Sequence, residues 1–337
     1  MPTIRDVAKR AGVAPITVSR VINDSSYVSQ KTRERVEVII EELGYVPNML
    51  GPSLRFKQTM TLALVLTDIT NPFWTTVARG VEDVAQANGY STILCNTDES
   101  EAKQEQYLQM LLRRRIDGIL LVPACSDAKP VHLIQKQGIP VVLLDREVSG
   151  VEVDIVRGDS ENGAYQLTQH LLSLGHQQIA LLTGPQTVST AVDRANGYRQ
   201  ALADTSLSDN AARVYWGGFT QDSGYQTANQ ALSAATQPTA LLAANNFIAI
   251  GALQALKEQG LHVPDDIALV TVDDMPSAFP IDPFLTAVTQ PAREIGRQGA
   301  QLLLDRLNGT IDAKYRHITL PIKMNIRTSS GQGIVTG

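Results

Sequence analysis

The feature that most constrains the fold is a regular alternation that begins at Thr61 and continues toward the C-terminus. Short apolar runs rich in β-branched residues alternate with longer amphipathic runs, which is typical of parallel sheets covered by helices on both faces. The predicted strands are LALVLT, STILC, DGILLVP, PVVLLD, QIALLTG, TALLAAN, IALVTVD and HITLPI. The predicted helices between them span residues 74–87, 102–114, 131–137, 162–174, 191–203, 223–234, 248–258 and 293–307. Because about 270 residues are too many for one sheet, we expect two α/β lobes.

The first 45 residues follow a different pattern, that of three short helices. Their ends are marked by Thr3 and Gly12 for the first helix, Pro15 for the start of the second, and Ser29 and Gly44 for the third. A serine or threonine cap opens a helix, proline suits its first position, and glycine closes it. Two helices joined by a turn of about three residues that contains glycine form a helix-turn-helix. Ala14 departs from the pattern, because it cannot accept a capping hydrogen bond, at a cost of about 1 kcal/mol.

In a helix-turn-helix, the start of the second helix lies against base edges in the DNA major groove. The predicted DNA contacts of this head are Thr3, Pro15, Ile16, Thr17, Ser19, Arg20, Asn23 and Thr32. Arg20 can hold guanine with a two-pronged fork, and Pro15 and Ile16 can meet a thymine methyl group. The hydroxyls of Thr17, Ser19 and Thr32 can donate to phosphates. The alternative is a small helical bundle with a solvated basic face, but turn, caps, charge and Arg20 together favour DNA binding.

Charge is divided unevenly along the chain. Residues 1–60 carry nine Lys and Arg against six Asp and Glu, a net charge of +3, so the remainder carries −8 of the total of −5. A small basic head on an acidic body fits a protein whose head alone meets a polyanion. The N-terminus lacks an apolar signal-peptide core, and no apolar run reaches the roughly 20 residues of a membrane span, which predicts a cytoplasmic protein.

The sequence contains no recognisable catalytic or metal-binding pattern. P-loop, G-x-G-x-x-G and G-x-S-x-G motifs are absent, and the five histidines have no metal-ligand spacing. Cys95 and Cys125 lie in apolar segments and are interpreted as buried thiols. We therefore expect no enzymatic activity, no cofactor and no metal. A sugar enzyme or a free sugar-binding protein would also leave the head unexplained.

Polar and aromatic side chains gather just after the apolar runs, where folds of this kind bind ligands. The candidate ligand-binding residues are Asn71, Phe73, Trp74, Asp145, Arg146, Arg194, Phe219, Asn245, Asp273 and Gln290. Aromatic faces surrounded by Asp, Arg, Asn and Gln suit a neutral polyol. Structural alternatives stay open: Phe73 and Trp74 as core aromatics, Asp145 and Arg146 as an ion pair, and Asp273 with Asp274 as a helix cap.

The chain resembles the lactose/galactose repressor family of bacterial transcription regulators over essentially its whole length. The resemblance rests on TIRDVAKRAGVAPITVSRVIN and YVSQKTRERVEVIIEELGYVPN in the head, and on NPFWTTVARGVEDVAQANGY, RRRIDGILLVP, DRANGY, VPDDIALVTVDD and LTAVTQP in the body. It implies a homodimer on a pseudopalindromic double-stranded operator. It also implies a body of two Rossmann-like lobes, like that of periplasmic sugar-binding proteins, with a small effector in the cleft.

The expected domains follow from this resemblance. They are a helix-turn-helix DNA-binding domain over residues 1–46, a hinge over 47–60, an effector-binding and dimerisation domain over 61–330, and a tail over 331–337. Within the body, the N-lobe comprises about residues 61–160 and 291–322, and the C-lobe about 161–290 and 323–330. No leucine heptad repeat follows Arg327, which favours a dimer over a tetramer.

Residues 48–56, NMLGPSLRF, fall where the family has a hinge helix that forms on DNA. The resemblance places Leu54 at the leucine that wedges into the minor groove, with Arg55 beside it. Gly51 and Pro52 replace the family's small and basic residues, and a proline inside a helix costs about 3 kcal/mol. Two outcomes stay open: a hinge helix that restarts at Pro52 and presents Leu54, or a passive linker with weak or altered DNA binding.

The candidate ligand-binding residues are similar in position to those of ribose-binding proteins and the ribose-repressor branch. Trp74 replaces a phenylalanine, and Val272 replaces a stacking aromatic, so a wider or differently shaped ring is compatible. Val188 replaces an arginine of the purine repressor, and the Asp145–Arg146 pair argues against a protein corepressor. The resemblance thus implies a repressor of sugar-catabolic genes controlled by ribose or another aldose. A non-sugar effector or a protein corepressor is the alternative.

Overall fold

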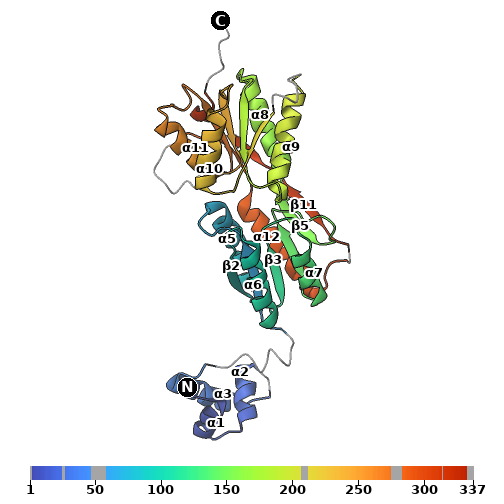
Figure 1. The fold of residues 1–337 in the computed structure, drawn as a ribbon. Coiled ribbons are helices and arrows are strands. Elements are labelled where there is room, and N and C mark those ends of the chain that lie inside the picture. The colour runs from blue at the N-terminus through green and yellow to red at the C-terminus, as the bar shows by residue number, and fades with distance from the viewer. Residues whose placement is uncertain are drawn as a thin grey trace. The chain divides into compact units, whose positions relative to one another are not determined.

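The structure, a computed structural model, describes residues 2–24, 27–46, 58–205, 212–274, 283–312 and 314–331. The chain divides into two compact units, Met1–Thr59 and Met60–Gly337. We call them the head and the body and describe each by itself (Figure 1).

The described part of the head contains α1 (Ile4–Ala11), α2 (Pro15–Ile22) and α3 (Gln30–Leu43). The hydroxyl of Thr3 accepts from the Asp6 backbone while the Asp6 carboxylate accepts from the Thr3 backbone, and Gly12 ends α1 at φ 62°. Buried side chains from all three helices, including Val7, Val18 and Val36, form one core. The predicted helices and the order of the helix-turn-helix are therefore confirmed.

Two helix starts in the head lack a side-chain cap. Ala14 gives α2 none, as expected from its methyl group. Ser29 occupies the N-cap position of α3, but no side-chain cap bond forms, because its hydroxyl pairs with that of Thr32 at 2.9 Å. The prediction that the Ser29 side chain caps α3 was wrong.

The body contains two sheets, one in each lobe (Figure 1). Sheet A, in the N-lobe, has the order β11-β5-β4-β3-β1-β2 and is parallel throughout. Its strands are β1 (Thr61–Leu66), β2 (Ser91–Asn96), β3 (Gly118–Leu121), β4 (Val141–Leu144), β5 (Asp154–Gly158) and β11 (His317–Leu320). Leu62 and Leu64 pack on one face of this sheet and Ala63 and Val65 on the other, so both faces are buried.

Sheet B, in the C-lobe, repeats this topology with the order β12-β10-β9-β8-β6-β7, in which only the β10–β12 pair is antiparallel. Its strands are β6 (Ile179–Thr183), β7 (Arg213–Trp216), β8 (Ala240–Ala243), β9 (Ala268–Val272), β10 (Thr286–Thr289) and β12 (Lys323–Asn325). The chain passes between the lobes three times, after β5, after β10 and after β11.

Helices cover both faces of each sheet. They are α5 (Pro72–Ala87), α6 (Glu101–Arg113), α7 (Lys129–Lys136) and α12 (Ala292–Asn308) on sheet A, and α8 (Ser160–Ser173), α9 (Ser189–Ala203), α10 (Gln221–Leu232) and α11 (Asn246–Glu258) on sheet B. A short 3-10 helix, Thr328–Ser330, follows β12. On sheet A, α5 and α12 share one face, and α6 and α7 the other. This confirms the predicted α/β class with a helix-turn-helix head and two lobes.

Four strands were missed because they lack the long apolar run that predicted the others. β5 contains Asp154 and Arg157, β7 lies at a sheet edge with every residue half-buried, β10 is threonine-rich, and β12 has three residues. Most predicted helices also began about two residues too late. Asn71 and Asn245 cap α5 and α11, which places the helix starts at Pro72 and Asn246. No helix in the described ranges is long and apolar enough to cross a membrane.

Candidate functional site

The first candidate site is the exposed start of α2 in the head. Pro15, Ile16 and Arg20 are exposed, and the Ile16 side chain is 58% accessible although it is apolar. Arg20 has no hydrogen bond or ion pair with any described residue, so its guanidinium is free to meet another molecule. Thr17 and Ser19 are half-buried beside it. These five predicted DNA contacts therefore share one surface.

Three other predicted contacts in the head already have intramolecular partners. Thr3 donates its hydroxyl to Asp6 at 2.7 Å, which keeps the pKa of the Asp6 carboxyl below its usual value. Asn23 donates to the Ser19 carbonyl at 2.7 Å, and Thr32 pairs with Ser29. Each would have to share its polar atoms with a phosphate. The predicted contacts Leu54 and Arg55, and the Gly51–Pro52 departure, lie outside the described residues.

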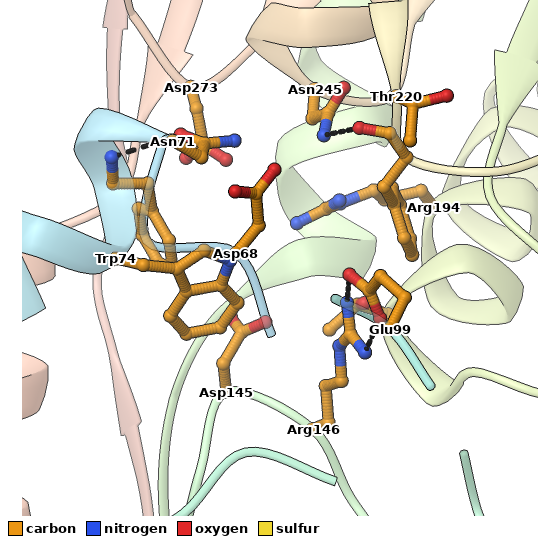
Figure 2. Close-up of a pocket in the computed structure, with 13 residues that line it drawn as sticks. Asp68, Asn71, Trp74, Glu99, Asp145, Arg146, Arg194, Thr220, Asn245 and Asp273 are labelled. Atoms are coloured by element: carbon orange, nitrogen blue, oxygen red, sulfur yellow. Dashed lines mark hydrogen bonds and ion pairs between the residues drawn. The ribbon is translucent and has the colours of Figure 1, made fainter. Parts of the chain in front are cut away.

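The second candidate site is a cavity between the carboxyl ends of the strands of sheets A and B (Figure 2). It encloses about 450 Å³ of space, including its open mouth. The N-lobe contributes Asp68, Asn71, Phe73, Trp74, Glu99, Asp145 and Arg146, and the C-lobe contributes Thr190, Arg194, Phe219, Thr220, Asn245 and Asp273.

Nine of the ten predicted ligand-binding residues line this cavity. Gln290 does not; it is buried behind Asp273 and donates to its Oδ1 at 2.9 Å, so it orients a lining residue. Sequence reasoning missed Asp68, Glu99, Thr190 and Thr220. Asp68 follows β1 almost directly, so the rule that selected the other strand-end residues could have found it. The positions of Glu99, Thr190 and Thr220 carried no comparable signal.

Arg146, which lines the cavity, forms an ion pair with Glu99, a partner that the sequence did not indicate. Its two terminal nitrogens donate to the Glu99 carboxylate at 2.6 and 2.7 Å, and one also donates to the Pro123 carbonyl at 3.0 Å. The alternative that Asp145 and Arg146 form a structural ion pair is therefore replaced by an Arg146–Glu99 pair. The guanidinium lies 5.1 Å from the centre of the Phe219 ring and 6.0 Å from that of Trp74, within cation–π range.

Arg194 enters the same space from the C-lobe. It donates to the Ala244 carbonyl at 2.8 Å and lies 6.0 Å from the Phe219 ring centre, so that ring packs against two guanidinium groups. Both arginines keep a buried Nε–H without a partner among the described residues. Figure 2 shows Arg194 and Asp68 pointing into one space from opposite lobes.

Asp145 and Asp273 occupy equivalent positions in the two lobes. Each directly follows a strand, at φ 63° and 61°, and each donates its backbone N–H to the next strand, at Val156 and Val288. A left-handed backbone is unusual for a residue other than glycine and is often found at functional sites. Burial raises the pKa of both carboxyls, that of Asp273 to about 6, although Arg194 opposes the rise. Asp145 Oδ1 has no partner in the described structure.

The aromatic and amide residues of the site also serve the fold. Phe73 and Trp74 meet edge to face at 4.7 Å and belong to the N-lobe core, so the core and cavity interpretations both apply. Asn71 and Asn245 cap their helices, and Asn245 also donates to the Phe219 carbonyl at 3.1 Å. Asp274, proposed as part of a cap, forms an ion pair with Arg327.

Polar contacts join the lobes on both sides of the cavity. On one side, Asn71 donates to Asn246 at 2.9 Å, and Asn246 donates back at 3.2 Å. On the other side, Arg157 of β5 pairs with Asp193 of α9 and with Glu147. The lobes are thus in direct contact around the cavity, and the Asn71–Asn246 and Arg157–Asp193 contacts, which cross between the lobes, must break for it to open widely.

Neither cysteine nor any metal cluster adds to the site. Both cysteines are free and buried, and burial raises the pKa of the Cys95 thiol to about 11, so it is not a reactive thiolate. Within the described ranges, no group of three or more His, Cys, Asp or Glu side chains is placed to hold a metal ion.

Comparisons with known proteins match both the head and the body of this chain. A family model described as bacterial regulatory proteins, lacI family, matches residues 3–48. A second, described as periplasmic binding proteins and sugar binding domain of LacI family, matches residues 59–328. The HTH-type transcriptional repressor PurR of Photobacterium profundum is 33% identical over 308 residues, which cover 91% of this chain and 92% of that protein.

Two solved structures extend the comparison. The Lac repressor dimer bound to operator and the anti-inducer ONPF is 31% identical, covers 98% of this chain and 99% of that chain, and has a TM-score of 0.83. A LacI family transcriptional regulator from Enterococcus faecium with bound ribose is 32% identical, covers 81% of this chain and 99% of that chain, and has a TM-score of 0.72.

Proposed function

Because the chain belongs to the LacI family of bacterial regulatory proteins, we propose that it is a DNA-binding transcriptional repressor whose operator affinity is set by a small neutral polyol in the cavity between the lobes. The PurR relatives are repressors, and the Lac repressor comparison is a dimer on its operator. We propose the same assembly here: a homodimer that places two heads on a pseudopalindromic duplex. It is a regulator, and catalysis forms no part of the proposal.

The exposed start of α2 supports the DNA-binding half of the proposal. Arg20 is a free guanidinium on the helix that enters the major groove in this motif, where an Arg–guanine fork contributes about 1–3 kcal/mol of discrimination. Ile16 is an exposed apolar side chain on the same surface, which fits contact with a thymine methyl group.

The main support for a polyol ligand is a set of buried polar atoms at the cavity that have no hydrogen-bond partner in the described part of the chain. Asp145 offers an acceptor, Oδ1, while Arg146 and Arg194 each offer a donor, Nε–H. A buried polar group without a hydrogen bond costs about 1–3 kcal/mol, so a ligand that completes these bonds gains affinity. A hydroxyl both donates and accepts, and several hydroxyls on one small ring can satisfy acceptors and donors in turn.

The charges and aromatic rings that line the cavity further restrict the chemical class of its ligand. Asp68, Glu99, Asp145 and Asp273 face only two cations, Arg146 and Arg194, among the residues that line the cavity. An excess of carboxylates disfavours phosphorylated or otherwise anionic ligands. The faces of Trp74 and Phe219 offer apolar surface to the C–H side of a ring. These charges and ring faces suit an aldose, and the related LacI family regulator from Enterococcus faecium has bound ribose.

Ligand and DNA binding are linked through the lobes in this proposal. A polyol that contacts Asp145 from the N-lobe and Arg194 from the C-lobe favours the closed cavity, together with the Asn71–Asn246 pair. Hinge closure of this type changes the relation of one lobe to the other. Coupling between two such sites is typically about 1–3 kcal/mol.

Thermal unfolding against a ligand panel tests the effector class. A ligand that binds only the folded protein raises its unfolding midpoint. We expect an aldopentose or aldohexose to raise the midpoint of the wild type but not of Arg194→Gln, whereas Asp222→Asn, at an exposed carboxylate of α10, should respond like the wild type. Sugar phosphates should have no effect. A shift produced by nucleobases and by no sugar would overturn the polyol assignment.

Selection from a random-sequence duplex library tests the DNA half independently of any effector. The wild type should recover a pseudopalindromic sequence, and Arg20→Ala should relax the base preference at one position of each half-site while leaving weak non-specific binding. A wild-type protein that recovers no common sequence would contradict the repressor assignment.

A further inference from the structure

Positive charge is clustered at the amino-terminal ends of several strands of sheet A, the end of the sheet opposite the cavity. The residues that directly precede β3, β4, β5 and β11 include six basic ones, Arg113, Arg114, Arg115, Lys136, Lys314 and Arg316, and three acidic ones, Asp117, Glu152 and Asp312. These nine residues carry a net charge of +3, whereas the whole chain carries −5. All six basic side chains are exposed. We call these six residues the basic edge.

The arginine triplet within the basic edge differs from most arginines of the body. Arg293 and Arg327 are held by carboxylates, and so is the buried Arg146. In contrast, the side chains of Arg113, Arg114 and Arg115 form no hydrogen bond or ion pair with another described residue. Three neighbouring guanidinium groups that repel one another and lack a carboxylate partner favour an external anion.

The basic edge lies where the chain from the head enters the body. The Asp117 backbone N–H donates to the Thr61 carbonyl at 2.9 Å, and that of Ser91 donates to the Met60 carbonyl at 2.9 Å. Arg115 is two residues from Asp117, so the triplet adjoins the first residues of β1. The tether from the head attaches at this edge, and a polyanion bound by the head is thereby kept at high effective concentration near it.

We propose that the basic edge is a second DNA-binding surface, at which the body's own arginines contact phosphates of the duplex that the head reads. This inference rests on the proposed function of the head. A guanidinium fork matches a phosphate, and such contacts add affinity without reading sequence. The acidic body, with −8 outside residues 1–60, thus carries a local positive surface beside the first residues of β1.

Salt dependence of DNA binding by the full-length protein tests this surface. The test variant is R113Q/R114Q/R115Q, and the matched control is R199Q/K257Q/K323Q, which removes the same charge from exposed C-lobe positions. Both are titrated by fluorescence anisotropy onto the duplex recovered by the wild type, between about 50 and 200 mM salt. The oligomeric state of each variant is checked by sedimentation.

Each phosphate contact contributes about 0.9 to the slope of log affinity against log salt. We expect the triplet variant to lose about 1 to 3 from that slope per protomer and to bind at least tenfold more weakly at low salt, with base preference unchanged. The control should match the wild type. An unchanged slope, a loss equal to that of the control, tighter binding, or dissociation of the protomers would each overturn the inference. A wild type that binds no duplex would instead refute the proposed function, and this inference with it.

Discussion

At the scale of single residues, the cavity is built around charges that the fold holds at a cost. Asp273 is buried at a left-handed backbone position, and burial raises its pKa to about 6 against an ordinary value of 3.8. The folded state therefore resists its ionisation. The stability it contributes is fully present below the unfolded pKa and is lost as the pH rises through about 6.

Asp273→Asn should therefore stabilise the ligand-free protein at pH 8 while weakening effector binding. The asparagine keeps an oxygen that can accept from Gln290 but never ionises. The gain should reach up to about 3 kcal/mol at pH 8 and vanish near pH 4, since each pKa unit corresponds to about 1.4 kcal/mol. Denaturant unfolding at both pH values measures it. A variant that is less stable than the wild type at pH 8 would contradict the buried-carboxylate account.

The Asn71–Asn246 pair gives a second prediction for a single side chain. Asn246→Asp removes the N–H that donates to Asn71 Oδ1 and places two acceptors face to face between the lobes. Asn71 Oδ1 keeps its bond from the Phe73 N–H, but the buried contact between the lobes loses a hydrogen bond and gains a repulsion, at a cost of about 1–3 kcal/mol, so effector affinity should fall about 5- to 100-fold. Calorimetric titration measures the dissociation constant, with Asn308→Asp, at an exposed end of α12, as the control. Equal affinities in the two variants would show that the pair plays no part in closure.

Most residues that line the cavity can be predicted from the sequence, but their partners cannot. Strand-end positions located Asp145, Asp273 and most of the other lining residues, because carboxyl ends of parallel strands meet at one edge. The partner of Arg146 could not be predicted. Glu99 is 47 positions away and reaches Arg146 only because β2 and β4 lie in one sheet. Gln290 lies behind the cavity for a similar reason, since the orientation of a buried side chain depends on packing.

At the scale of elements, the N-lobe depends on a close crossing of α5 and α12. A Cβ added at Gly80 would lie 2.1 Å from the Arg293 carbonyl oxygen, and one at Gly296 would lie 2.1 Å from that of Val77. Gly80→Ala should therefore force the helices apart and lower stability by about 1–3 kcal/mol. Gly218→Ala, whose Cβ would meet only ordinary contacts near 3.7 Å, is the control. Similar unfolding midpoints in both variants would contradict this packing.

Two histidines of the C-lobe contribute to its response to acid. His170 contacts Ser330 and His176 contacts Thr239, and burial lowers the pKa of both rings. Their stabilising effect is present above the unfolded pKa of about 6.5 and is lost as the pH falls through the folded values. Thermal midpoints should fall below pH 6.5, and less steeply in His170→Gln. An identical acid response in the variant would exclude His170 from this effect.

Strands and helices differ in how well their sequences predict them. Fully buried strands such as β1 and β6 have continuous apolar runs, and all eight strands predicted from such runs are present. β5 and β7 were missed because edge or crossover positions tolerate charged and half-buried residues. The starts of α5 and α11 were placed too late because Asn71 and Asn245 cap them, whereas the sequence analysis interpreted both asparagines only as ligand-binding residues.

At the scale of the whole molecule, we propose that a DNA-reading head is controlled by a body whose two lobes close around a polyol. Linkage requires the effector to change operator affinity by the same factor by which the operator changes effector affinity. The structure offers a physical basis in the contacts that span the lobes, the Asn71–Asn246 pair on one side and Arg157 with Asp193 on the other.

The most direct test is to measure that factor in both directions. Operator affinity is titrated by anisotropy with and without the saturating aldose found in the thermal panel, and aldose affinity is titrated by calorimetry with and without operator. We predict equal factors of about 5 to 150 from the two titrations, and no coupling in Arg194→Gln. An aldose that binds the cavity but leaves operator affinity unchanged would contradict the central claim.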